Sequence, residues 1–177
     1  MKEFQAPCGP FLLAMKPVII RPGEKKDLPS VLELIRELAR YERAEHEVTN
    51  TLEQMERDGF GEQPVYDFFV SEAGSDIIGI SIFYFRYSTW KGKRLYLEDI
   101  VVTETQRGRG IGKMLFEHTM RKSLTENCSG MMWQVLEWNE PAINFYKKYG
   151  AGLDGEWTNC SLEAVQIMKL LNDSSIT

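Results

Sequence analysis

The chain has 177 residues, of which 43% are hydrophobic and 27% are charged, and this size and composition are typical of one globular domain. The net charge of -5 argues against a general affinity for nucleic acid or for an anionic membrane surface. Because no window holds about 18 consecutive apolar residues, the sequence predicts no membrane-spanning helix.

The predicted elements begin after an N-terminal tail. Residues 1–14 hold two prolines and no apolar run long enough for a signal peptide. We expect them to form a tail without fixed structure, or a non-native extension, and residues 15–177 to form a single domain.

The first part of the domain predicts two helices and four strands. A β-branched run at 18–20 indicates a strand, and Asp27 is expected to cap a helix over residues 28–43. The stretch from Thr49 to Thr51 offers the cap of a short helix over residues 51–58, which Gly59 ends. Consecutive antiparallel strands are then expected at 65–72, 77–87 and 94–103, with a hairpin turn at 74–76.

The pattern changes after residue 103. A glycine-rich turn opens a helix over 110–126, and a strand over 131–137 follows. Such a strand–turn–helix–strand unit predicts that its two strands are parallel. The last predicted elements are a helix over 141–149, a strand over 155–160 and an amphipathic helix over 162–171. The fold class is therefore α/β with a mixed sheet.

The glycine-rich turn runs from Thr105 to Lys113, directly between a strand and a helix. Its glycines let successive amides point at one centre, and the helix N-terminus adds positive charge, so the turn suits a phosphate or a pyrophosphate. It is not a P-loop, because Met114 follows Lys113 where Ser or Thr is required, and its spacing does not fit Gly-x-Gly-x-x-Gly. A tight turn without a ligand remains the alternative.

The cysteines and histidines give no sign of a metal site. Cys8, Cys128 and Cys160 are odd in number and widely spaced, and the chain has only two histidines. This pattern predicts neither a disulfide framework nor a zinc site. We expect no metal, and we expect the thiols to be reduced and buried in a cytoplasmic protein.

Three segments together carry a family resemblance: 97–102 (LEDIVV), 107–112 (RGRGIG) and 138–146 (WNEPAINFY). In these the chain resembles the GNAT acetyltransferase superfamily, and within it the spermidine/spermine (diamine) N-acetyltransferases, over about residues 16–171. The resemblance implies the GNAT fold, a mixed and mostly antiparallel sheet with a parallel βαβ unit at the acetyl-CoA site and helices on both faces. It also implies acetyl-CoA as co-substrate, a small amine acceptor and a homodimer.

The resemblance also implies the residues that bind acetyl-CoA. Backbone groups of Ile100, Val101 and Val102 would pair with the pantetheine arm, and Asn139 with Ala142 would line it. The pyrophosphate would lie on the glycine-rich turn, against Arg107, Gly108, Arg109, Gly110, Ile111, Gly112 and Lys113.

Glu98 and Tyr146 are the candidate catalytic residues. A primary amine is almost wholly protonated at pH 7, so the enzyme must remove a proton before the nitrogen attacks, and it must protonate the departing thiolate. Glu98 is expected to remove that proton, on a strand face shared with Tyr96 and Ile100. Asp99 is open to a functional or a structural reading. Tyr146 is the candidate general acid, since it follows Ala142 by one helical turn; a core tyrosine is the alternative.

The acceptor amine is expected at the acidic segment 40–62, which has seven carboxylates against three arginines. Tyr41 and Glu42 match amine-binding residues of the resembled enzymes, and Trp90 would either wall the pocket or anchor its own loop. Ser88 stands where polyamine enzymes carry an acidic residue, and the loop at 152–156 is short. We therefore expect a short cationic acceptor. An amino-acid or amino-sugar acetyltransferase and a non-catalytic acetyl-CoA sensor are the alternatives.

Overall fold

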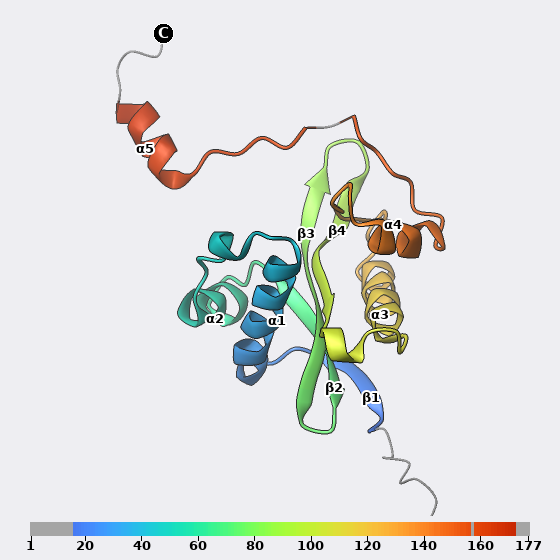
Figure 1. The fold of residues 1–177 in the computed structure, drawn as a ribbon. Helices are drawn as coiled ribbons and strands as arrows, with labels where there is room; N and C mark the ends of the chain where they lie inside the picture. The colour runs from blue at the N-terminus through green and yellow to red at the C-terminus, as the bar shows by residue number, and fades with distance from the viewer. Residues whose placement is uncertain (1–15, 157, 173–177) are drawn as a thin grey trace, which may run out of the picture. The chain divides into compact units, whose positions relative to one another are not determined.

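The computed structural model describes residues 16–156 and 158–172. The chain divides into two compact units, Met1–Gln134 and Val135–Thr177. Figure 1 shows the sheet and the first three helices in the first unit. The tail expected over residues 1–14 lies outside the described residues.

The first unit is built on a five-stranded sheet whose strands are neighbours in chain order. The strands are β1 (Val18–Pro22), β2 (Asp67–Ala73), β3 (Asp76–Ser88), β4 (Gly92–Val102) and β5 (Met131–Met132). The pairs from β1 to β4 are antiparallel, and β4 and β5 are parallel. The predicted mixed sheet with one parallel unit is confirmed, although the strand expected over 131–137 is only two residues long.

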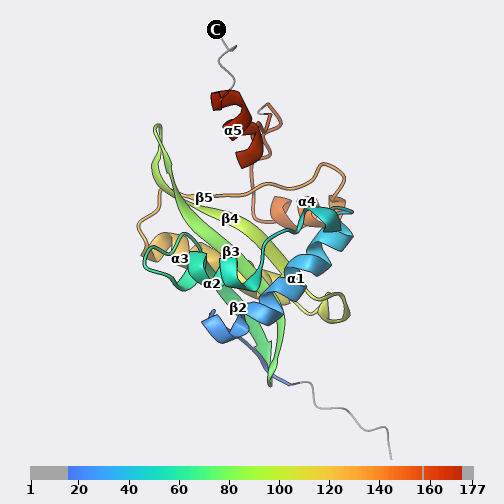
Figure 2. The same cartoon turned by 90° about the vertical axis from the view of Figure 1, so that its left-hand side faces the viewer.

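Helices cover both faces of this sheet, as expected. Figure 2 shows α1 (Leu28–Tyr41) and α2 (Leu52–Phe60) in front of the sheet and α3 (Ile111–Thr125) behind it. Val31 of α1 is fully buried in a core cluster with Ile80 of β3 and Val101 of β4. On the other face, the buried hydroxyls of Ser81 and Thr119 form a hydrogen bond of 2.9 Å between β3 and α3.

The two predicted helix caps have different outcomes. Thr51 accepts a hydrogen bond from the amide of Gln54, whose side chain accepts one from the Thr51 amide, so α2 begins with a capping box. Asp27 precedes α1, but its carboxylate makes no cap hydrogen bond to that helix. It accepts two bonds from the Arg21 guanidinium, at 2.6 and 2.9 Å, so this charge anchors β1 instead.

A bulge in β4 corrects the predicted faces of that strand. Ile82 pairs with Asp99 and Phe83 pairs with Leu97, so Glu98 has no partner in β3. The extra residue inverts the alternation of side chains beyond it. Glu98 is the unpaired residue of the bulge and still acts on Tyr84 and Tyr96, and the register also puts Asp99 on the Tyr96 face, the one that α1 covers.

The second unit contains α4 (Glu140–Lys147) and α5 (Ala164–Asn172). Both helices were expected, within two residues at each end. The strand predicted over 155–160 is wrong: the described residues of that stretch, which are all but residue 157, are exposed and form no strand. Glycine and asparagine favour strands poorly, and a strand also needs a partner to pair with.

The prediction of buried thiols is also wrong for the two cysteines among the described residues. Cys128 is half-buried and Cys160 is exposed, and both are free. Cys8 lies outside the described residues. Over the part of the chain that the structure describes, no helix has the length and apolar character that crossing a membrane requires.

Candidate functional site

The glycine-rich turn has a backbone that only glycine adopts readily. Gly108 and Gly110 have φ angles of 77° and 78°, in the left-handed region. A Cβ atom on either residue would meet no heavy atom within 4 Å, so the space beside the turn is open. Gly110 is the N-cap of α3, whose first amides have no acceptor within the helix. This arrangement fits an anionic group such as a phosphate.

The three cations of the turn already have partners in the protein. Arg107 donates from Nε to the carbonyl of Val102 over 2.9 Å, and its guanidinium lies 3.4 Å from Glu37 and 5.5 Å from the ring centre of Tyr41. Arg109 donates to Gln106. Lys113 pairs with Glu117 at 3.7 Å. Arg107 thus connects the turn to α1 and does not stand free in solvent.

The edge of β4 opens close to this turn. Its pairing with β5 ends at Tyr96 and Met132, so 100–102 continue the strand beyond the last residue that β5 pairs. Unpaired strand edges present amide and carbonyl groups to an extended partner. These residues therefore fit the role expected of them, which is to pair with the amide-bearing pantetheine arm of CoA.

Two carboxyl groups act on a third, that of Asp99, at the end of α1 and the bulge of β4. Glu42 is the C-cap of α1 and half-buried, and burial raises the pKa of its carboxyl. Burial, followed by the charges of Glu98 and Glu42, raises the pKa of Asp99 to about 6. Glu98 itself is exposed. A cation would relieve the repulsion among these carboxylates, so the group suits an ammonium ion.

Two tyrosines line the same face of the sheet. The rings of Tyr84 and Tyr96 lie 5.1 Å apart, and Arg86 lies 5.7 Å from the Tyr96 ring centre. Burial, and then the charge of Glu98, raises the pKa of both phenols, so both stay protonated near neutral pH. Sequence reasoning missed Tyr84 because only the strand register shows that it lies opposite Tyr96.

Trp90 and Ser88 lie at the turn between β3 and β4. Ser88 Oγ accepts hydrogen bonds from the amides of Trp90 and Lys91, at 3.3 and 3.2 Å. The Trp90 side chain is 84% exposed. In this structure Trp90 neither walls a pocket nor packs on its own loop.

The remaining predicted site residues belong to the second unit. Asn139 begins α4, and its side-chain oxygen accepts a hydrogen bond of 3.3 Å from the amide of Ala142. Tyr146 is buried, and its ring centre lies 5.3 Å from that of Phe145. Ala142 and Tyr146 thus both lie in α4, one helical turn apart as expected, and Asn139 caps that helix.

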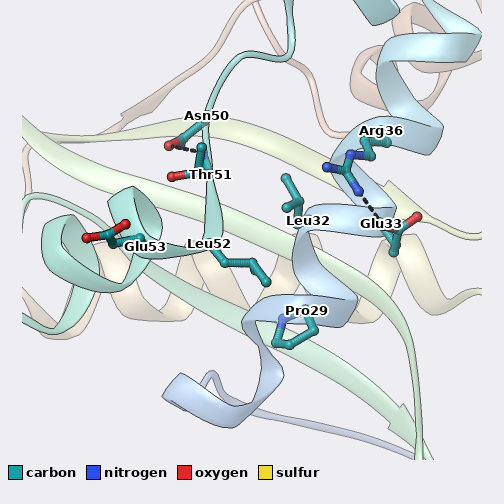
Figure 3. Close-up of a pocket in the computed structure, with 8 residues that line it drawn as sticks. All are labelled: Pro29, Leu32, Glu33, Arg36, Asn50, Thr51, Leu52 and Glu53. Carbon is teal, nitrogen blue, oxygen red and sulfur yellow. Dashed lines mark hydrogen bonds and ion pairs between the residues drawn. The ribbon is translucent and has the colours of Figure 1, made fainter.

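A surface pocket lies between α1 and the beginning of α2, as Figure 3 shows. Apolar side chains of Leu32 and Leu52 line it, together with the ion pair of Arg36 and Glu33, whose charged atoms are 2.6 Å apart. None of the predicted site residues lines this pocket, so we assign it no role.

Comparison with known proteins defines the class of this fold and site. The model of the acetyltransferase (GNAT) family matches residues 28–151. The chain belongs to this family, whose members use acetyl-CoA, and it is an N-acetyltransferase.

Two relatives and one solved structure are informative. The chain is 40% identical over 142 residues to thialysine N-epsilon-acetyltransferase of Bos taurus, covering 76% of this chain and 84% of that protein. It is 36% identical to human spermidine/spermine N(1)-acetyltransferase-like protein 1, covering 75% of this chain and 20% of that protein. An integron cassette protein of V. cholerae shares the fold, with a TM-score of 0.70, 23% identity, and coverage of 87% of this chain and 97% of its own.

Proposed function

We propose that this N-acetyltransferase transfers the acetyl group of acetyl-CoA to the terminal primary amine of a short cationic acceptor, a lysine-like amino acid or a diamine. The observation that supports a cationic acceptor is the cluster of three carboxyl groups formed by Glu42, Glu98 and Asp99. Relatives that act on thialysine, which is a lysine analogue, support the same class.

The carboxylates perform two tasks in this proposal. Asp99 and Glu42 hold the ammonium ion, and Glu98 removes its proton, directly or through a water, so that the neutral nitrogen can attack. Glu98 suits the transfer because the bulge frees it from strand pairing and leaves it exposed. Tyr84, which remains protonated, provides a hydroxyl beside this group.

Acetyl-CoA supplies the thioester, and the first unit supplies two features that fit it. The turn from Arg107 to Lys113 receives the pyrophosphate on its amides, and the open edge formed by 100–102 pairs with the pantetheine arm. Tyr146 donates a proton to the thiolate that leaves, and Asn139 orients α4 through its cap. A homodimer and a cytoplasmic location remain part of the proposal.

The proposal is tested by incubating the protein with acetyl-CoA and thialysine, measuring free thiol, and locating the acetyl group by mass spectrometry. We expect one acetyl group on the terminal amine for each thiol released. Isothermal titration with acetyl-CoA measures binding independently of turnover, and so distinguishes an enzyme from a non-catalytic acetyl-CoA sensor. Tight binding without thiol release over a panel of diamines, lysine analogues and amino-sugars would contradict the enzymatic proposal and favour the sensor.

A further inference from the structure

Arg43, which directly follows Glu42 of the carboxyl cluster, has an unusual backbone conformation. Arg43 has a φ of 60°, in the left-handed region that side-chain-bearing residues rarely occupy. It is the residue after the C-cap of α1: its amide donates to the carbonyl of Arg40, and the amide of Ala44 donates to that of Ala39. These two bonds form a Schellman motif, in which this position is usually glycine.

An arginine at such a position carries a cost in backbone strain. Its charge gives a small favourable interaction with the C-terminal end of the helix dipole, but any lysine or arginine in the last turn provides this, and Arg40 already does so. The helix dipole therefore does not explain why this position is an arginine, and a binding role of its side chain would.

Arg43 lines a surface pocket with Arg40, Glu45 and His46. Arg40 is paired with Glu45 at 3.3 Å. Arg43 is exposed, and across the described residues no acidic side chain forms an ion pair with it. The pocket thus offers one uncommitted guanidinium next to one carboxylate.

A guanidinium beside a carboxylate complements the α-carboxylate and α-ammonium of a lysine-like amino acid, at the opposite end from the reacting amine. The pocket lies at the C-terminal end of α1, where Glu42, whose charge acts on Asp99, directly precedes Arg43. A diamine offers a second ammonium ion there, whereas a lysine-like amino acid offers an α-carboxylate and an α-ammonium. Guanidinium groups bind carboxylates with two parallel hydrogen bonds.

We propose that Arg43 binds the α-carboxylate of a lysine-like acceptor, with Glu45 beside it for the α-ammonium, and so makes the enzyme selective for amino acids over diamines. This inference rests on the proposed function, because it takes the terminal amine to lie at Glu42, Glu98 and Asp99. It adds a residue that determines which short amine is used.

The test compares two acceptors that differ in one group: thialysine and its decarboxylated analogue, the thioether diamine of the same length. The quantity measured is the ratio of kcat/KM for thialysine to kcat/KM for that diamine. We expect Arg43→Gln to lower this ratio about tenfold, mainly through KM for thialysine. Arg43→Lys keeps the charge but loses the two parallel hydrogen bonds, so it should lower the ratio by less. Arg36→Gln, which removes an exposed charge of α1 outside this pocket, is the matched control and should leave the ratio unchanged.

Arg43→Gly separates binding from folding. Glycine removes both the guanidinium and the backbone strain, so the melting temperature should not fall, while the ratio should fall as in Arg43→Gln. An unchanged ratio in both variants, or a wild-type enzyme that does not prefer thialysine to the diamine, would overturn the inference. Failure of the wild type to acetylate either amine would instead overturn the proposed function on which it rests.

Discussion

The charge of Glu42, at the end of α1, acts on the carboxyl group of Asp99, in β4. The charge of Glu42 contributes, after burial and the charge of Glu98, to a pKa of about 6 for Asp99. Glu42 precedes β2 and Asp99 lies in β4, so two residues far apart in the sequence are coupled electrostatically. A site that holds negative charges together without a cation is less stable than it is with one, which is the physical basis for binding an amine here.

The raised pKa of Asp99 predicts how stability depends on pH. The folded protein binds this proton more tightly than the unfolded chain, so Asp99 lowers the free energy of unfolding as pH rises from about 4 to about 6, by up to about 2–3 kcal/mol. Asp99→Asn should therefore raise the melting temperature at pH 8, with a gain that shrinks towards pH 4. Asp76→Asn, at the exposed first residue of β3, is the control. A lower melting temperature for Asp99→Asn at pH 8 would refute this account.

Asp27 predicts the opposite dependence. Its hydrogen bonds with Arg21 hold the pKa of its carboxyl below the ordinary value, so its stabilisation is complete above the pKa of the unfolded chain and is lost as pH falls through the folded pKa. Asp27→Asn removes one of the two carboxylates that pair with the Arg21 guanidinium, and Glu72 remains as the other. We expect it to lower the free energy of unfolding by about 2 kcal/mol at pH 7, the scale of a hydrogen bond to a charged group. Urea denaturation at pH 7 and pH 3 measures this loss, which should be smaller at pH 3.

Gly110 predicts the effect of blocking the turn. Gly110→Asp adds a negative side chain where a phosphate is expected, and acetyl-CoA should bind at least tenfold more weakly, or about 1.4 kcal/mol. Gly92→Asp is the matched control, since Gly92 has a φ of 77° and equally open surroundings, but lies at the turn between β3 and β4. Equal affinities for the two variants in calorimetry would show that the turn does not bind the cofactor.

If Tyr146 is the general acid, replacing it should lower kcat without weakening the binding of acetyl-CoA. Tyr146→Phe keeps the ring and removes the proton, so kcat should fall on the order of a hundredfold while the affinity for acetyl-CoA changes far less. Tyr149→Phe, in the same unit, is the control and should retain its rate. If Tyr146→Phe turned over at a near-wild-type rate, a water or the amine itself would supply that proton.

Much of the fold follows from patterns that the sequence carries locally. The alternating and helical spacings gave the order of elements, and Thr51 caps α2 as its neighbours predict. Asp27 has the same sequence signal as a cap, but Arg21, six residues earlier, competes for its carboxylate. Such a competition is visible only when β1 and α1 are placed together.

The candidate site was predictable in its motifs and less so in its geometry. The bulge at Glu98 leaves no local signal, because an extra residue in one strand is defined by the partner strand. The coupling of Asp99 to Glu42 and the register of Tyr84 with Tyr96 depend on contacts distant in sequence. The left-handed backbone of Arg43 is likewise set by the helix end and not by the residue itself.

The most direct test of the central claim is a comparison of kcat/KM for acetyl transfer over amines of increasing length: thialysine, lysine, short diamines, spermidine and spermine. Ser88 supplies no charge for a distal ammonium ion, and each lost exposed pairing is worth only about 0.2–1 kcal/mol, so the preference should be graded. We predict the highest kcat/KM for lysine-like amines and short diamines. Spermidine or spermine as the best acceptor by tenfold or more, or no acetyl transfer to any of these amines, would contradict the account.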